Sequence, residues 1–255
     1  MSLVATDAIV LHAFDYLESS RILRLVTRDV GVRSVLARGA RRSSRRFGTA
    51  LDLYAQGSAE LDMKIGRDLD TLNGFDVQRA RPQLAAQLSR FTGASAIAEL
   101  ILRFAGDAVD PGLFDTVAQS LDDIAVAMPA RVRDITLASA WRILADLGVA
   151  PTIDQCAECA AAIETESPAM FSHPAGGALC ARCGHLARGG RTLPATARHA
   201  LRHWLSGESH ALPDAADVRA HQRLLREFLR EHLADDRPLR AFDVWERDAW
   251  TGGAA

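Results

Sequence analysis

The segment Ile22-Leu23-Arg24-Leu25-Val26, followed by Val30-Gly31-Val32-Arg33-Ser34-Val35-Leu36-Ala37, decides which fold we expect at the start of this chain. Both runs are short and either apolar or alternating, which is typical of β-strands, and residues 29–31 between them suit a hairpin turn. Runs of the same kind lie at residues 8–11, 53–65 and 70–77. Five short strands with no helix before about residue 80 predict a small barrel or a curled sheet.

The residues after Pro82 change to helical periodicity. Apolar side chains recur every three or four positions over residues 83–105, where Gly93 is a candidate break. A second helix is predicted to begin at Asp110-Pro111, and a third to run over residues 131–147 and to stop at Gly148. Helices resume near Pro194 and over residues 217–233. The expected fold class is α+β, with strands first and then one helical domain, at residues 83–150 and 193–234, around a cysteine-rich insert at about 152–190.

Length and composition are those of a globular protein of one or two domains. Hydrophobic residues make up 48% of the 255 positions and charged residues 24%. These values are enough for a sizeable core and exclude a disordered chain, a collagen and a disulfide-dense toxin. No run of 18 apolar residues could span a membrane, and residues 1–10 lack the basic start of a signal peptide. We therefore expect a cytoplasmic protein.

Two CxxC pairs carry the strongest chemical signal. Cys156-Ala-Glu-Cys159 is followed, after 20 residues, by Cys180-Ala-Arg-Cys183. Each pair can present two thiolates on one side of a turn, and two such turns complete a tetrahedral zinc site. Because four thiolates leave no open position for water, the predicted zinc ion is structural. The alternatives are four buried reduced thiols or a redox CxxC motif, and the latter would need only one pair.

Two histidines lie near these cysteines and are candidate substitute ligands. With four cysteines present, we expect His173 and His185 to be surface residues instead. Motifs for phosphate loops, dinucleotide binding and zinc proteases are missing from the sequence. Gly93-Ala-Ser95-Ala-Ile97 lacks the second glycine of a nucleophile elbow and lies in a helical stretch. We therefore expect no catalytic residues.

Arginines are concentrated near the N-terminus although the whole chain has a net charge of −2. Residues 21–46 contain one acid, Asp29, and nine arginines: Arg21, Arg24, Arg28, Arg33, Arg38, Arg41, Arg42, Arg45 and Arg46. Some of those on the strands should share a sheet face. The last five lie in a loop after a predicted strand, and we predict that Arg38, Arg41, Arg42, Arg45 and Arg46 contact DNA phosphates. The alternative is an ordinary solvated loop.

Two weaker features accompany this loop. The strand region holds five aromatic residues that either stack on bases or fill the core: Phe14, Tyr16, Phe47, Tyr54 and Phe75. At least half of them should be core residues. A further basic stretch at residues 182–204 contains five arginines and no acid, and it is the alternative DNA surface.

Several segments, taken in order, resemble the RecO family of bacterial DNA repair proteins over nearly the whole chain. They are Ala8-Ile9-Val10-Leu11, Tyr16-Leu17-Glu18, residues 25–31, Ala37-Arg38-Gly39-Ala40-Arg41-Arg42, residues 144–151 leading to Cys156, Phe171-Ser172, and Gly176-Gly177 before Cys180. The family loop commonly carries a lysine after the paired arginines, where this chain has Ser43-Ser44.

The resemblance implies an OB-fold β-barrel at residues 1–80 and a helical domain at 81–255, with a zinc-binding insert at about 152–190. It also implies a non-enzymatic recombination mediator associated with the nucleoid. Such a protein binds single- and double-stranded DNA, anneals complementary strands, and with RecR helps to load RecA on strands coated by single-stranded DNA-binding protein. The acidic tail of that protein would suit a basic-rimmed apolar groove somewhere in residues 83–234.

Two other functions compete with the mediator. A zinc-stabilised adaptor would use the same motifs to bind an acidic protein, and salt-dependent, sequence-independent DNA binding would separate the two functions. An enzyme with a dispersed site would show a deep pocket with converging titratable groups. We expect no such pocket.

Overall fold

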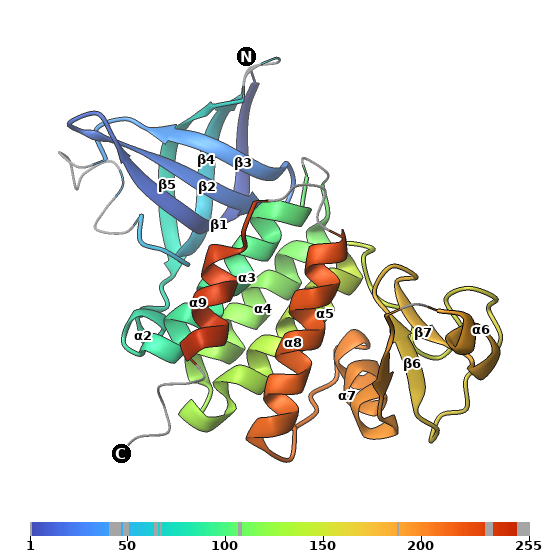
Figure 1. Cartoon of the computed structure of the whole chain (residues 1–255). Helices are drawn as coiled ribbons and strands as arrows, with labels where there is room; N and C mark the ends of the chain where they lie inside the picture. Colours follow the sequence, from blue (N-terminus) through green and yellow to red (C-terminus); the bar gives the residue numbers. More distant parts are fainter. Residues whose placement is uncertain are drawn as a thin grey trace. The chain divides into compact units, whose positions relative to one another are not determined.

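The computed structural model describes residues 2–40, 47, 51–63, 66, 68–106, 109–187, 189–232 and 237–248. The described residues form two compact units, which Figure 1 shows together. The first unit combines residues from Met1–Pro129 with the later segment Leu239–Asp248. The second unit lies within Ala130–Pro238.

The first unit begins with a closed five-stranded barrel. Its strands are β1 (Ser2–Tyr16), β2 (Ser20–Thr27), β3 (Gly31–Ala37), β4 (Gln56–Met63) and β5 (Asp70–Arg79). They follow the order β1-β2-β3-β5-β4, and all neighbours are antiparallel except β3 and β5. This is the arrangement of an OB fold, so the predicted α+β class with an N-terminal OB barrel is confirmed.

The long strand β1 closes the barrel by pairing on both sides. Its N-terminal part pairs with β4 from Ser2 to Ile9, and its C-terminal part pairs with β2 from Ala8 onward. The register with β2 shifts between Val10 and His12. Such a bulge bends a strand and increases its twist, which lets one strand belong to both walls of a small barrel.

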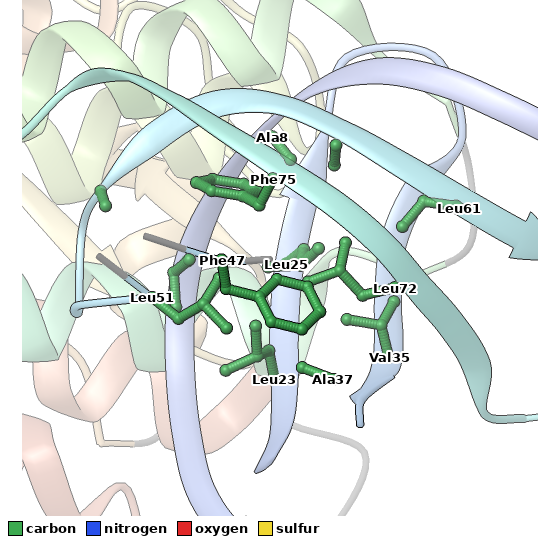
Figure 2. Close-up of a cluster of buried hydrophobic side chains, with 13 residues drawn as sticks. Ala8, Leu23, Leu25, Val35, Ala37, Phe47, Leu51, Leu61, Leu72 and Phe75 are labelled. Atoms are coloured by element: carbon green, nitrogen blue, oxygen red, sulfur yellow. The ribbon is translucent and has the colours of Figure 1, made fainter. Parts of the chain in front are cut away.

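Apolar side chains from every strand fill the barrel, and side chains from the β3–β4 connection join them (Figure 2). The buried members are Ala8, Val10, Leu23, Leu25, Val35, Ala37, Phe47, Leu51, Ala55, Ala59, Leu61, Leu72 and Phe75. The connection therefore contributes core residues in addition to joining two strands.

Within the part of the chain that the structure describes, the first unit also contains the helices α2 (Pro82–Ala85), α3 (Leu88–Phe104), α4 (Pro111–Val126) and α9 (Arg240–Asp248). The helix break falls at residues 86–87, so the candidate break at Gly93 is wrong. Gly93 is buried inside α3, where a small residue permits close packing. Helix α4 begins at Asp110-Pro111 as predicted, and Asp110 caps it, because its carboxylate accepts hydrogen bonds from the amides of Gly112 and Leu113.

A buried arginine ties the barrel to α4. Arg81 donates to the carbonyl oxygen of Tyr54 at 2.9 Å and to Oε1 of Gln56 at 2.9 Å, both at the barrel. It also donates to Oδ1 of Asp122 on α4 at 2.7 Å. Because these acceptors satisfy a buried guanidinium, Arg81 is a structural cation and not a ligand-binding one.

The second unit combines helices with a small sheet. After the short 3₁₀ helix η1 (Pro129–Arg131), its elements are α5 (Val132–Asp146), β6 (Ala169–Ser172), β7 (Gly177–Leu179), α6 (Ala181–Leu186), β8 (Arg191–Leu193), α7 (Ala195–Leu205) and α8 (Ala215–His232). The strands follow the order β7-β6-β8. Aromatic contacts link α5, α8 and β6, with the ring of Phe228 lying 5.4 Å from Trp141 and 6.3 Å from Phe171. Among the described residues, no helix is long and apolar enough to cross a membrane.

Candidate metal centre and nucleic-acid surface

The first cysteine pair lies on a tight turn held by main-chain hydrogen bonds. The amide of Cys156 donates to the carbonyl of Ala161, and the amide of Ala160 donates to the carbonyl of Cys156, both at 2.8 Å. Ala160 adopts a positive φ of 57°, which turns the chain back on itself. The amide of Ala157 also donates to Ala178 on β7 at 2.8 Å, so this turn is attached to the small sheet.

The second cysteine pair lies at the start of α6. Cys180 is the residue before the helix and accepts a hydrogen bond from the amide of Gly184 at 2.8 Å. Gly184 directly follows this pair and lies inside α6. A Cβ there would approach Cβ of Met170 to 3.0 Å, so close packing on β6 is the reason for the glycine.

The two turns bring four sulfur atoms together. The Sγ atoms of Cys156, Cys159, Cys180 and Cys183 all lie within 4.8 Å of one another, and all four are free thiols. The separation between Cys159 and Cys180 is 3.8 Å, and a tetrahedral site with Zn–S bonds of about 2.3 Å needs sulfurs about 3.8 Å apart. The donor set and the spacing therefore fit one zinc ion.

The main chain around this centre favours the thiolate form of Cys156. Desolvation raises the pKa of the Cys156 thiol, but hydrogen bonds from the main chain of Cys180, Cys159 and Glu158 outweigh that effect and lower the pKa to about 6. Thiolates are the form that binds zinc. His173 does not belong to this cluster, because its Nε2 lies 3.1 Å from Oε2 of Glu227 on α8. His185 is exposed on α6.

The basic stretch at residues 182–204 is mostly used inside the second unit. Arg198 is fully buried and donates to the main-chain carbonyls of Ile153, Glu164 and Ser167. Arg202 pairs with Asp154 at 2.6 Å, and Arg191 pairs with Glu227 at 2.6 Å. Three of its arginines therefore hold the fold together, which removes most of the basis for a DNA surface there.

Several barrel arginines are also engaged within the first unit. Arg28 pairs with Asp115 at 2.6 Å and lies 4.6 Å above the ring of Phe114, while Arg21 pairs with Asp15 at 3.2 Å. Arg33 donates to the carbonyl of Val30 at 2.7 Å. The expectation of a shared sheet face is therefore met only in part. Arg21 and Arg33 pair with Ala37 and Leu25, which are core residues, so both arginines lie on the core-facing side of the sheet. Arg24 pairs with Ser34 on the opposite face.

The predicted phosphate-binding loop is bounded by two anchored residues. Ala37 ends β3 by pairing with Arg21, and Phe47 is only 2% exposed in the barrel core (Figure 2). Arg38 directly follows Ala37 and is exposed. The other predicted DNA-binding residues, Arg41, Arg42, Arg45 and Arg46, lie outside the described residues.

The five aromatic residues separate into two groups. Phe47, Tyr54 and Phe75 are buried, which agrees with the expectation that at least half belong to the core. Phe14 and Tyr16 are 45% and 42% exposed at the end of β1. The ladder pairs Phe14 with Ile22 and Tyr16 with Ser20, close to the row that joins Arg21 to Ala37. Two exposed rings and the start of the basic loop therefore lie at the same end of the barrel.

A pocket of about 650 Å³ lies in the second unit, within residues 166–224. Its floor is apolar and includes Phe171, Leu193 and Leu224, while Arg223 and His199 are among its polar lining residues. Glu166, Arg191, His210, Asp217 and His221 also contribute. The expectation that no pocket with titratable groups exists is therefore wrong, because elements far apart in sequence converge here: β6, β8, α7 and α8.

Comparisons with known proteins cover nearly the whole chain. Sequence models described as Recombination protein O N terminal and Recombination protein O C terminal match residues 1–81 and 85–241. The DNA repair protein RecO of Anaeromyxobacter sp. (strain K) is 38% identical over 186 residues, which cover 72% of this chain and 71% of that protein. The RecO protein of Anaeromyxobacter sp. (strain Fw109-5) is 34% identical over 233 residues, with coverages of 88% and 89%. That of Rubrobacter xylanophilus is 32% identical over 242 residues, with coverages of 93% and 94%.

Proposed function

Because this chain belongs to the RecO family of DNA repair and recombination proteins, we propose that it is a non-enzymatic recombination mediator. It binds single- and double-stranded DNA, anneals complementary strands and, together with RecR, promotes the loading of RecA on strands coated by single-stranded DNA-binding protein. It acts in the cytoplasm, at the nucleoid. We further propose that residues 1–80 are the DNA-binding domain and that residues 81–255 are the helical domain, with its zinc-binding insert at about 152–190.

The observation that carries this proposal is that two exposed rings lie at the same end of the barrel as Arg38, the first residue of the basic loop. Phe14 and Tyr16 offer exposed faces to unpaired bases. Arg38 is exposed at the same end of the barrel. We propose that it and the arginines that follow it, Arg41, Arg42, Arg45 and Arg46, supply positive charge for the phosphates. The hairpin between β1 and β2 is one of the loops with which OB folds bind oligonucleotides. This pairing of stacking with charge favours single strands of any sequence.

Annealing requires no bond chemistry. Two complementary strands repel one another through their phosphates, and a basic surface that holds both strands reduces this repulsion and raises their local concentration. Base pairing then supplies the driving force. The reaction should therefore need no ATP and no metal ion beyond the structural zinc held by Cys156, Cys159, Cys180 and Cys183.

Action on coated strands requires a second contact, and the pocket of the second unit is our candidate for it. Its apolar floor around Phe171, Leu193 and Leu224 suits apolar residues at the end of a peptide. Arg223, which is exposed on α8, suits the acidic residues of that peptide. We propose that the acidic tail of single-stranded DNA-binding protein binds here.

The test is an annealing assay with complementary oligonucleotides, either bare or precoated with single-stranded DNA-binding protein. We expect faster annealing on both substrates without ATP, and a loss of the effect on coated strands when the tail of the coating protein is deleted. Arg223→Glu should reproduce that loss, whereas Arg219→Glu should not, because Arg219 lies one turn earlier on α8 and does not line the pocket. Equal rates with and without the tail would remove the tail contact from the mechanism.

The second candidate is an adaptor that binds an acidic protein instead of DNA. A gel-shift assay at two salt concentrations separates the two functions. DNA binding through phosphates should weaken steeply with salt and should not depend on sequence. If the protein neither binds bare DNA nor accelerates its annealing, the mediator is excluded and the adaptor remains as the candidate function.

A further inference from the structure

Three histidines converge in the second unit, away from the four cysteines in sequence. His199 and His203 lie one turn apart on the same face of α7, and His210 comes from the segment that follows this helix. The chain reverses at Gly207, whose φ of 82° favours glycine. One ring nitrogen from each histidine lies within 4.8 Å of the other two. The ring centres of His199 and His203 are 4.4 Å apart, and the other two separations are 5.2 and 5.3 Å.

A carboxylate sets the tautomer of the central histidine. Nδ1 of His203 lies 2.5 Å from Oε2 of Glu208, so this nitrogen carries a hydrogen and donates a hydrogen bond to the carboxylate. The other nitrogen, Nε2, then carries a free electron pair. It faces Nε2 of His199 at 3.1 Å. A histidine that donates to a carboxylate through one nitrogen and presents the other is the usual arrangement of a metal ligand.

Core packing does not account for this cluster. His199 is exposed, and His203 and His210 are only partly buried, so little apolar surface is gained by bringing the rings together. Three imidazole rings that lie this close are a suitable ligand set for a cation, whereas without a metal ion their protonated forms would repel one another.

We propose that His199, His203 and His210 bind one zinc ion at the rim of the pocket. Imidazole nitrogen is a preferred donor for zinc, and two histidines four residues apart on a helix can bind one ion together. When the metal binds, the proton on Nε2 of His199 moves to Nδ1 or to solvent, which frees this nitrogen as a ligand.

Three histidines leave a coordination position open on a tetrahedral ion. His199 and His210 both line the pocket, so a water molecule or a carboxylate inside it can reach this position. The site therefore differs from the four-cysteine centre, in which protein sulfurs occupy all four positions. It is a place where the pocket can bind an acidic ligand through a metal ion.

The test compares the zinc content of the full-length protein and of a variant. Each is dialysed to equilibrium against the same micromolar zinc buffer and analysed by mass spectrometry for metal per chain. We expect the wild type to hold one zinc ion more than His199→Gln, which changes an exposed side chain and should fold normally. His12→Gln is the matched control, because His12 is also exposed but lies on the barrel. It should keep the wild-type content.

A second measurement identifies the ligands directly. The chain has eight histidines, and their ring nitrogens can be followed by NMR with ¹⁵N-labelled histidine. Zinc should shift the signals of His199, His203 and His210 together. Equal zinc contents in the wild type and His199→Gln, or shifts confined to other histidines, would overturn the proposal. Neither result depends on whether the protein binds DNA.

Discussion

Two nitrogens of the Arg198 guanidinium, Nε and Nη2, donate hydrogen bonds to the carbonyl oxygen of Ile153, at 3.2 and 3.0 Å. The same side chain donates from Nη1 to the carbonyls of Glu164 and Ser167 at 2.9 and 2.6 Å. Arg198 lies on α7, whereas its acceptors lie in the segment that carries the first cysteine pair. A fully buried cation on a helix therefore organises the main chain beside the predicted zinc centre.

Arg198→Ala should destabilise the second unit strongly. It would leave three carbonyl groups without their donor in a buried place, at a cost of about 3 kcal/mol or more. Arg202→Ala, one turn later on the same helix, removes a partly exposed pair with Asp154 and should cost less than about 1 kcal/mol. Urea unfolding of both variants measures the difference. Similar losses of stability in Arg198→Ala and Arg202→Ala would contradict the role assigned to Arg198.

Phe47→Ala should destabilise the barrel by about 3–5 kcal/mol, because it leaves a cavity among Leu23, Leu25 and Leu72. It should also weaken DNA binding, since Phe47 anchors one end of the basic loop. Phe14→Ala is the matched control for stability, because this ring is half exposed. Thermal unfolding should show a lower melting temperature for Phe47→Ala only. An unchanged melting temperature would mean that Phe47 is not a core residue.

Replacement of both Arg41 and Arg42 by Ala should weaken binding to all DNA sequences alike. The slope of log affinity against log salt should fall by about one for each lost phosphate contact. Stability should stay the same. A double Ala variant at Arg219 and Arg230, both exposed on α8, removes the same charge and should bind as the wild type does. Wild-type affinity of the loop variant at physiological salt would exclude the loop as the DNA site.

Removal of zinc should unfold the insert but spare the barrel. A structural zinc site can contribute on the order of 10 kcal/mol to folding. Cys156→Ser, or treatment with a strong chelator, should therefore increase hydrogen exchange over residues 152–190. Binding of DNA by residues 1–80 should persist, because the barrel closes through its own strands. Metal analysis that finds no zinc bound by the cysteines would contradict this account.

The stability of the second unit should fall when the pH drops below about 6.5. Burial and, to a smaller extent, the charge of the nearby His210 together lower the pKa of His221 to about 4. The unfolded chain binds a proton near pH 6.5, whereas the folded chain resists it until about pH 4, so stability is lost between these values. At 1.36 kcal/mol per pKa unit, the loss is about 3 kcal/mol. Between pH 7.5 and pH 4.5, the free energy of unfolding measured in urea should fall less for His221→Gln than for the wild type. An equal drop in the free energy of unfolding for the variant and the wild type would show that His221 is not the cause of the pH dependence.

Local patterns in the sequence identified most of the elements. Alternating residues indicated the strands, three- and four-residue spacing indicated α3, α4, α5 and α8, and Asp110 and Gly148 marked helix ends. The two CxxC pairs identified the predicted metal ligands, because a turn of four residues is formed by near neighbours in the chain. Strands as short as β7 and β8 were not predicted, because three residues are too few to show a period. Helix α9 was also missed.

Tertiary structure decided which side chains are used within the fold and which remain available. Arg198 and Arg38 look alike in the sequence, but one is buried against three carbonyls and the other is exposed. Phe47 and Phe14 differ in the same way. Helix α9 joins the first unit through the amide of Phe242, which donates to Oε2 of Glu99 at 3.0 Å across 143 positions.

The physical reason is that residue spacing determines the local conformation of a short stretch of chain, whereas burial depends on which distant segments pack together. The cluster of His199, His203 and His210 illustrates both ranges. The spacing of the first two is visible in the sequence, but the reversal at Gly207 brings the third back to them. The sequence by itself determined the family, most of the strand and helix types and the four cysteines of the predicted metal site. Tertiary packing decided which charged and aromatic side chains of this chain are exposed and can bind a ligand.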